Sequence, residues 1–442
     1  MIQFSPEELS QWVSSPWRNR SPDTVVTGVS TDTRTLNPGD LYVAVRGDNF
    51  DGHAFIADAF AKGAVGALVT EGFEWTHGPI LTVPDTIQGL QDLARGYRNG
   101  WTAIPIGITG SVGKTTVKEM CADILSEVGK THRTCGNYNN HIGLPLTMLS
   151  MPSDAKYGVF EIGMNHPGEI AVLTDLLRPQ IGILTDICNS HRESFESLEA
   201  IAREKAELPW SVPSSGTVIL DCDSEWHDLV QSHLSAREIT VSYEGNADYT
   251  GHYAGALTID VNGYKYEVPL PGEHIMRNAL RAIALGLELE VEPDQINRGL
   301  AKFTAPPMRW AKSTVNGVEF INDAYNANPL SMRAALRTFY ELPLEGGKWV
   351  VVGGMRELGV ISDVEHAALG EYIDGLGFDG VITVGVLGKG ILCKSTCRFF
   401  QCPTSEEAVA VLKDNLSAGD SVLLKASRGE HLELVLKDFR EI

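Results

Sequence analysis

The sequence predicts an α/β protein whose central part is a mostly parallel, doubly wound sheet. Short apolar runs typical of buried strands alternate with helical stretches along most of the 442 residues. A glycine-rich turn at residues 107–116 joins one such strand to one such helix, as phosphate-binding loops do. A chain of this length exceeds what one core usually serves, so we expect several domains, and the pattern divides into three.

The segment from residue 24 to about residue 83 predicts a small α/β module. Strand-like runs occupy residues 41–45, 67–69 and 80–83, with one helical stretch at 54–62. The pattern changes between residues 99 and 104. We therefore predict a first domain at residues 1–102.

The middle of the chain has the most regular alternation and predicts the parallel sheet. Strands are expected at residues 104–108, 158–161, 181–184 and 217–220, and helices at 168–177 and 198–208. Ligands of such sheets gather at the carboxyl ends of the strands, so Glu161 and Asp186 are expected near the glycine-rich turn. This domain is predicted to cover residues 103–309.

Pro306 and Pro307 indicate a second hinge, after which the alternation resumes. Strands are expected at residues 348–352, 381–384 and 421–424, and helices at 330–340, 363–373 and 405–416. A third α/β domain at residues 310–442 follows.

The composition argues against a nucleic-acid or membrane protein. Asp and Glu number 57 against 36 Lys and Arg, a formal net charge of -21, which opposes binding to polyanions. The seven cysteines are an odd number, and those at 393, 397 and 402 lack a metal-binding spacing. The N-terminus has no signal-like pattern, and no apolar run has the length of a membrane span. We expect a cytoplasmic monomer with no nucleic-acid partner.

The glycine-rich turn carries chemistry that can be assigned from its residues. Glycines let backbone N–H groups face a phosphate, the helix N-terminus adds positive potential, Lys114 reaches the outer phosphates, and the Thr115 hydroxyl can ligate Mg²⁺. The expected ATP cradle is Gly110, Ser111, Val112, Gly113, Lys114, Thr115 and Thr116. Ile108 stands where the usual spacing has another glycine, and a chance match in a surface turn is the alternative.

Three further segments point to a known family. They read Gly136-Asn-Tyr-Asn-Asn-His-Ile-Gly-Leu-Pro-Leu-Thr147, Glu161-Ile-Gly-Met-Asn-His-Pro-Gly-Glu169 and Asp323-Ala-Tyr-Asn-Ala-Asn-Pro329. With the glycine-rich turn they resemble, nearly end to end, the Mur ligases, which form amide bonds at the expense of ATP. The subtype that these segments resemble implies UDP-N-acetylmuramoyl-tripeptide and D-alanyl-D-alanine as substrates. It also implies an N-terminal UDP-sugar domain, a central ATPase and a C-terminal Rossmann-like domain.

The family's reaction requires cations around an anionic site, because a carboxylate must first be activated by ATP as an acyl phosphate. The resemblance assigns catalysis to Lys114, His191, Lys205 and Arg309. It assigns two Mg²⁺ sites to Thr115, Glu161, His191 and Lys205, the last as a carbamate. It adds Asn278, Arg309 and Asp323 to the ATP site. It places the UDP sugar at Ser30, Thr31, Asp32, Arg34, Asn137 and Asn140, and the acceptor at Asn326, Asn328, Ser427 and Arg428.

Plain structural alternatives exist for several of these residues. Glu161 could be a solvated strand-end carboxylate and Lys205 an exposed helix lysine, and Asn278 and Asn328 could each start a helix. Residues 31–35 could form a polar turn. Ile275 and Ala426 depart from the family pattern, which has Asn and Gly there. At the level of function, the alternatives are a folylpolyglutamate- or cyanophycin-type ligase, or a nucleotide-regulated binding protein without catalysis.

Overall fold

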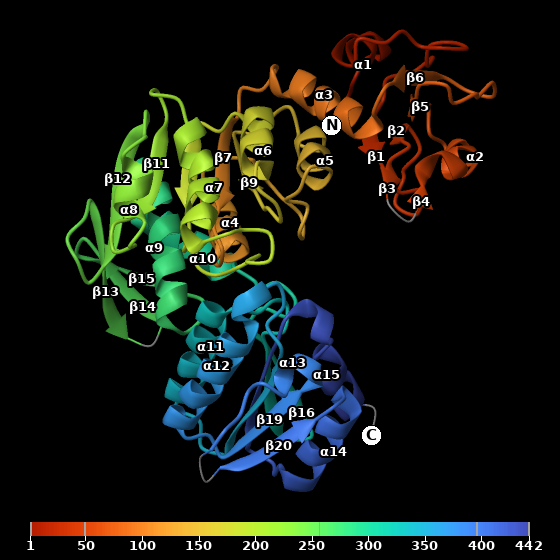
Figure 1. Ribbon diagram of the computed structural model, residues 1–442. Coiled ribbons are helices and arrows are strands. Elements are labelled where there is room, and N and C mark those ends of the chain that lie inside the picture. The colour runs from red at the N-terminus through yellow and green to blue at the C-terminus, as the bar shows by residue number, and fades with distance from the viewer. Residues whose placement is uncertain (1, 48–49, 256, 395–396, 441–442) are drawn as a thin grey trace.

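The chain forms three α/β domains, each built on its own sheet. The structure is a computed structural model that describes residues 2–47, 50–255, 257–394 and 397–440. The N-terminal domain contacts the central domain through helix α3 (Thr86–Arg98), and the C-terminal domain lies on another side of the central domain (Figure 1).

The N-terminal sheet is parallel, with the strand order β1-β2-β5-β6. Its strands are β1 (Gly28–Ser30), β2 (Asp40–Val43), β5 (Gly66–Thr70) and β6 (Ile80–Val83), and a short hairpin pairs β3 (Arg46–Gly47) with β4 (Phe50–Asp51). The helical stretch expected between these strands is confirmed as α2 (Ile56–Ala61), and two further helices, α1 (Pro6–Trp12) and α3, lie outside the segment for which it was predicted. Their caps were visible in the sequence: Ser5 and Glu8 form a capping box, and Asp85 caps α3.

The central sheet has the strand order β15-β14-β13-β12-β11-β10-β7-β9-β8. Its parallel strands are β7 (Ile104–Thr109), β8 (Thr131–Arg133), β9 (Tyr157–Glu161), β10 (Ile181–Leu184), β11 (Thr217–Asp221), β12 (Arg237–Tyr243) and β13 (Tyr249–Gly255). The antiparallel strands β14 (Thr258–Val261) and β15 (Tyr264–Glu267), which the sequence did not predict, extend one edge. The predicted doubly wound sheet is confirmed.

Helices cover both faces of the central sheet. One face packs against α4 (Lys114–Leu125), α9 (Glu273–Glu288) and α10 (Pro293–Lys302), and the other against α5 (Gly143–Leu149), α6 (Glu169–Leu177) and α7 (Leu198–Ser211). The short α8 (His227–Gln231) follows β11. Strand β7 lies between β10 and β9, at the point where the strand order reverses, so the turn that follows it opens into the crevice where ligands of such sheets bind.

The C-terminal sheet has the order β16-β17-β21-β18-β19-β20, and only the β16–β17 pair is antiparallel. The strands are β16 (Ala311–Val315), β17 (Val318–Asn322), β18 (Lys348–Gly353), β19 (Gly380–Val384), β20 (Arg398–Cys402) and β21 (Ser421–Lys425). The helices are α11 (Pro329–Glu341), α12 (Ser362–Leu376), α13 (Gly385–Gly388), α14 (Ser405–Asn415) and α15 (Glu433–Arg440). Separate apolar clusters fill its two faces, as in Rossmann-like folds.

No helix within the described ranges combines the length and the apolarity that crossing a bilayer requires.

The lack of a side chain at Gly299 lets α10 approach α4 closely, so a substitution there should destabilise the protein. A Cβ atom at Gly299 would lie 2.5 Å from Ile124 Cα, whereas one at Gly375 of α12 would meet no atom within 4 Å. We expect Gly299→Ala to lower the free energy of unfolding by about 1–3 kcal/mol. The matched variant Gly375→Ala should raise it by about 0.5–1 kcal/mol. Thermal unfolding of both variants measures the difference, and equal stabilities would contradict the close approach.

Candidate active site

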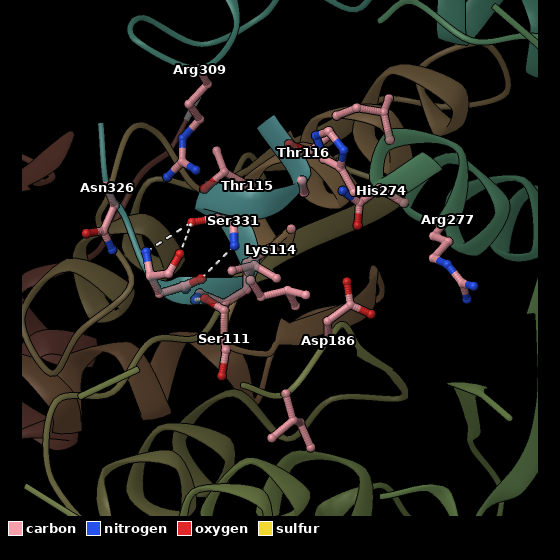
Figure 2. A pocket seen from close by; sticks show the side chains of 18 of the residues that line it. Ser111, Lys114, Thr115, Thr116, Asp186, His274, Arg277, Arg309, Asn326 and Ser331 are labelled. Atoms are coloured by element: carbon pink, nitrogen blue, oxygen red, sulfur yellow. Dashed lines mark hydrogen bonds between the residues drawn. The ribbon is translucent and has the colours of Figure 1, made fainter. Parts of the chain in front are cut away.

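A cavity of about 730 Å³ lies between the central and C-terminal domains. The central domain contributes the glycine-rich turn, the ends of β9, β10 and β11, and the start of α9. The C-terminal domain contributes the segment before α11 and one side of that helix. Figure 2 shows Lys114, Thr115, Asp186, His274 and Arg309 around this pocket.

The glycine-rich turn has the geometry of a phosphate cradle. Gly110 and Gly113 have φ angles of 149° and 86°, and α4 begins at the next residue, Lys114. A Cβ atom at Gly113 would lie 2.4 Å from Oδ1 of Asn278. Asn278 is buried, and its Oδ1 has no hydrogen-bond partner among the described residues. The turn therefore requires glycine here, and Asn278 borders it directly instead of only supporting α9.

The segment that follows β10 holds the turn in place. Ser111 N donates to Asp186 O (2.7 Å), and Thr185 Oγ1 donates to Val112 O (2.6 Å). Ser111 Oγ also donates to Cys188 O (3.0 Å). Ile108, at the position where the usual spacing has glycine, is a buried residue of β7.

Two lysines converge on one carbonyl oxygen. Lys114 Nζ and Lys205 Nζ donate to Gly110 O at 2.7 and 3.0 Å. Lys205 is only 1% exposed, so the alternative of an exposed helix lysine is wrong. Burial lowers the pKa of Lys114, and burial together with the nearby Lys114 lowers the pKa of Lys205 well below its ordinary value. Burial therefore disfavours the charged form of both amines, and an anion bound beside them would stabilise it.

Glu161 is held at the carboxyl end of β9 and is 2% exposed, not solvated. Its carboxylate accepts hydrogen bonds from Thr115 Oγ1 (2.9 Å) and Asn139 Nδ2 (2.8 Å). Its backbone N–H donates to Thr134 Oγ1 (3.0 Å). Asn139 was missed from the sequence, although it lies in the segment 136–147 that carried the family resemblance.

The oxygen donors fit Mg²⁺, although they do not form a closed cage. Thr115, Glu161 and His191 line the same cavity. Within the described ranges no group of three or more His, Cys, Asp or Glu side chains is arranged to hold a metal ion. Mg²⁺ usually keeps several waters and binds through one or two carboxylates plus substrate phosphates, so an open donor set suits it.

His191 contacts the C-terminal domain. Its Nδ1 lies 2.6 Å from Oε2 of Glu357, and this hydrogen bond lowers the pKa of the Glu357 carboxyl group. Glu357 was not predicted from the sequence.

Arg309 points into the pocket from the linker between the two domains (Figure 2), and its guanidinium lies 4.1 Å from the ring centre of Tyr325. The Asp323 carboxylate accepts from Trp310 N (3.1 Å) and pairs with Lys425 Nζ (2.8 Å). Lys425, which the sequence left without a role, is buried and also donates to Asn326 O. Asp323 and Lys425 thus fix the linker against the C-terminal sheet.

The remaining acceptor-side residues differ in position. Asn326 and Asn328 line the cavity, and Asn328 Oδ1 accepts from Ser331 N (2.9 Å), so Asn328 does start α11. Ser427 is buried and accepts from Arg356 N, while Arg428 is exposed beside Glu433. Neither Ser427 nor Arg428 forms part of the cavity wall.

The predicted UDP-sugar residues lie at the junction of the N-terminal and central domains. Asp32 accepts from Arg34 N (2.9 Å) and pairs with its guanidinium, which lowers the pKa of Asp32, so this segment is a polar turn. Ser30 Oγ donates to Asp32 O, and Thr31 is partly exposed between them. In the central domain, Asn140 Oδ1 accepts from Gly143 N at the start of α5, which contacts β1, and Asn137 is exposed in the preceding loop.

Both departures from the family pattern are buried apolar residues. Ile275 is a buried residue of α9 that packs in the core and also borders the cavity, and Ala426 follows β21 in the core of the C-terminal domain. Each side chain therefore contributes to packing where the family has Asn or Gly.

Comparison with known proteins identifies the family. Residues 25–98 match the Mur ligase family catalytic domain, residues 108–286 the Mur ligase middle domain, and residues 308–428 the Mur ligase glutamate ligase domain. The UDP-N-acetylmuramoyl-tripeptide--D-alanyl-D-alanine ligase of Bacillus subtilis (strain 168) is 35% identical, covering 100% of this chain and 99% of the relative. The enzyme of the same name from Escherichia coli (strain K12) is 34% identical over 95% of each chain.

This chain belongs to the Mur ligase family.

Solved structures agree with this assignment. MurF from Acinetobacter baumannii superposes with a TM-score of 0.92 at 29% identity, covering 100% of this chain and 99% of that chain. MurF from Thermotoga maritima in complex with ADP gives a TM-score of 0.83 at 26% identity, covering 94% and 97%. A folylpolyglutamate synthase from Mycobacterium tuberculosis, at 16% identity and a TM-score of 0.60, shares the fold alone.

The contact between Gly113 and Asn278 predicts a selective loss of nucleotide binding in this Mur ligase. Gly113→Ala should weaken ADP binding about 100-fold or more, because the new methyl group must displace Asn278 and the loop. Gly168 is a matched control, since it too precedes a helix, with a φ of 87°, but has no atom within 4 Å of a Cβ position. Isothermal titration calorimetry should show ADP binding near the wild-type value for Gly168→Ala. Equal losses in both variants would leave backbone strain as the only cause.

Burial of Lys205 predicts that removing its amine stabilises the fold. The unfolded chain binds more protons than the folded chain between the lowered pKa and the ordinary value of about 10.4, so wild-type stability rises with pH in that window. Lys205→Met should raise the free energy of unfolding at pH 7 by on the order of 1–3 kcal/mol, and the gain should shrink toward pH 10. Urea unfolding in CO₂-free buffer measures both values.

Lys118→Met is the control for that substitution. Lys118 is also fully buried, but it pairs with Glu119 (2.8 Å) and donates to Thr134 O (2.7 Å). Its removal should destabilise the protein. If Lys205→Met destabilises to the same extent, Lys205 is not an undercompensated charge.

Proposed function

We propose that this Mur ligase joins D-alanyl-D-alanine to UDP-N-acetylmuramoyl-tripeptide, with conversion of ATP to ADP and phosphate, in the synthesis of a peptidoglycan precursor. Relatives named for this reaction align with the chain along nearly its whole length. The observation that carries the proposal is the glycine-rich turn, where Lys114 and the Thr115–Glu161 pair line the cavity and the buried Lys205 contacts the same turn. This arrangement suits transfer of a phosphoryl group between anions.

In the proposed reaction the tripeptide carboxylate accepts the γ-phosphoryl group of ATP and becomes an acyl phosphate. The free amine of D-alanyl-D-alanine then attacks the acyl carbon, loses its proton, and displaces phosphate. The backbone N–H groups of residues 110–116 bind the phosphates, and Asn278 and Asp323 border the rest of the nucleotide. Lys114 exchanges Gly110 O for phosphate oxygens, and Arg309 approaches the γ-phosphate from the linker. Each cation thereby gains an anionic partner.

Metal binding is proposed at two positions. Thr115 and Glu161 would hold one Mg²⁺, and His191 with a carbamate on Lys205 would hold the second. Bound Mg²⁺ neutralises phosphate charge during transfer. Lys205 suits carbamate formation because CO₂ reacts with a neutral amine, and burial lowers the pKa of this lysine.

The two organic substrates are proposed to bind on opposite sides of the cavity floor. Ser30, Thr31, Asp32, Arg34, Asn137 and Asn140 would hold the UDP sugar, and Asn326, Asn328, Ser427 and Arg428 the acceptor. The uridine side is supported by the contact between β1 and α5, which brings both segments to one junction. Ser427 and Arg428 reach the acceptor only if the C-terminal domain moves further over the central domain.

We further propose a cytoplasmic monomer with domains at residues 1–102, 103–309 and 310–442. The cysteines at 121, 135, 188, 222, 393 and 402 form no disulfide bond, which suits a reducing compartment. Each proposed boundary falls between the last strand of one sheet and the first strand of the next: between β6 and β7, and between β15 and β16.

The purified protein should convert UDP-N-acetylmuramoyl-tripeptide, D-alanyl-D-alanine and ATP into the pentapeptide, ADP and phosphate. Mass spectrometry of the product, with lysine and meso-diaminopimelate peptides compared, measures the reaction and its preference for the third residue. Lys114→Ala should reduce turnover at least about 1,000-fold, because it removes a cation that acts on the transferred phosphoryl group. ATP hydrolysis with folate and glutamate, and none with the muramoyl peptides, would instead identify a ligase of another substrate class.

A further inference from the structure

A histidine from the central domain and a glutamate from the C-terminal domain meet beside the cavity. His191 Nδ1 lies 2.6 Å from Glu357 Oε2, and the two side chains are 21% and 45% exposed. This is a close contact between a ring nitrogen and a carboxylate oxygen, and the interaction lowers the pKa of the Glu357 carboxyl group.

The backbone on both sides is shaped for this contact. His191 and Glu357 have φ angles of 55° and 65°, a conformation that non-glycine residues rarely adopt. Glu193 N donates to Glu357 O (3.3 Å), and Ser194 N donates to His191 O (3.0 Å). At Gly359 a Cβ atom would lie 3.3 Å from Glu193 Cα, so the two loops approach closely at the backbone level. The pair is therefore part of an extended loop-to-loop contact.

The partner of Nδ1 determines what Nε2 can do. An ionised carboxylate only accepts hydrogen bonds, so it favours the tautomer of His191 in which Nδ1 carries the proton and Nε2 of the neutral ring keeps its lone pair. Among the described residues none is hydrogen-bonded to Nε2. His191 lines the same cavity as Thr115 and Glu161. A histidine that ligates a metal usually donates its other ring N–H to a carboxylate or carbonyl group, which fixes the ring.

We propose that Glu357 is a positioning residue for His191, and that it fixes the tautomer and ring orientation in which Nε2 faces the second Mg²⁺. The proposal rests on the proposed function, in which His191 is a ligand of that metal. Because Glu357 belongs to the C-terminal domain, the second metal site reaches full affinity only when this domain is docked on the central domain. The metal affinity of the second site thereby depends on how the two domains are arranged.

The ring tautomer can be tested without activity. In the full-length protein with ¹⁵N-labelled histidine, the His191 imidazole should show a protonated Nδ1 and an unprotonated Nε2. Glu357→Ala should shift the ring toward a mixture in which the Nε2–H tautomer predominates, as in free histidine. Glu357→Gln keeps an acceptor at the same reach and should retain much of the wild-type pattern.

Metal affinity provides the second measurement, with Mn²⁺ as the probe. Electron paramagnetic resonance of free Mn²⁺ should detect two sites in the wild-type protein when a non-hydrolysable ATP analogue and dissolved CO₂ are present. Glu357→Ala should weaken the second site about 10-fold or more and leave the first unchanged. Glu193→Ala is the matched control, because it removes a carboxylate of the same interface whose side chain has no hydrogen bond or ion pair within the described residues. It should bind Mn²⁺ as the wild type does.

Equal Mn²⁺ affinity in Glu357→Ala and wild type would overturn the proposal. Tighter binding in Glu357→Ala would also overturn it, since Glu357 would then compete with the metal for His191. Neither result would affect the proposed function. A wild-type protein with only one Mn²⁺ site would instead remove the metal role of His191, on which both the second Mg²⁺ site and this inference depend.

Discussion

The hydrogen bonds between the glycine-rich turn and the extension of β10 are the constraint on which the active site depends. Ser111 and Val112 are each bonded to that extension, and Asp186 within it is tied to Asp221 of β11 by Arg281, at 2.7 and 2.8 Å. Arg281 is 1% exposed and comes from α9, the helix that also places Asn278 against Gly113. The turn is thus fixed by two strands and one helix, and its backbone N–H groups are oriented before any phosphate arrives.

The same turn carries a local concentration of positive charge in a strongly acidic chain. At a formal net charge of -21, the protein as a whole repels anions at long range, but such repulsion fades beyond about 8 Å at physiological ionic strength. Lys114 acts within that distance, and burial strengthens its interaction with an anion. Because Lys114 shares Gly110 O with the buried amine of Lys205, it lacks a full complement of partners without ligand. The buried lysine amines are thus incompletely compensated at the place where substrate anions would bind and stabilise them.

Local features of the fold could be predicted from the sequence. Strands at 80–83 and 181–184 have the predicted bounds, and the glycine-rich turn lies between its strand and helix, because each of these signals is carried by adjacent residues. Helices α1 and α3 of the N-terminal domain were missed although their capping residues are present. Many residues in each helix are polar, so the apolar periodicity of the buried face is weak in the sequence. The antiparallel edge of the central sheet was also missed, because its short strands are polar on one face.

The site contacts that were missed are all long-range. Asn139 reaches Glu161, and Lys425 reaches Asp323, across 22 and 102 residues of chain. The burial of Lys205 depends on how its helix packs against the turn, which its own neighbours in sequence do not determine. The family resemblance assigned roles to Glu161, Asp323 and Lys205. Only the tertiary structure shows that Asn139 and Lys425 support the first two.

The linker between the central and C-terminal domains connects domain position to chemistry. Trp310 N is bonded to Asp323 and Tyr325 N to Met308 O, so the linker residues around Arg309 are anchored on the C-terminal domain. Arg309 itself stacks on Tyr325 of that domain. A rotation of the C-terminal domain therefore moves Arg309 relative to Lys114, and it moves Glu357 relative to the central domain in the same step. One rigid-body motion thus changes both the distance between Arg309 and Lys114 and the contact between Glu357 and His191. The C-terminal domain can therefore be required for phosphoryl transfer although the phosphate-binding loop belongs to the central domain.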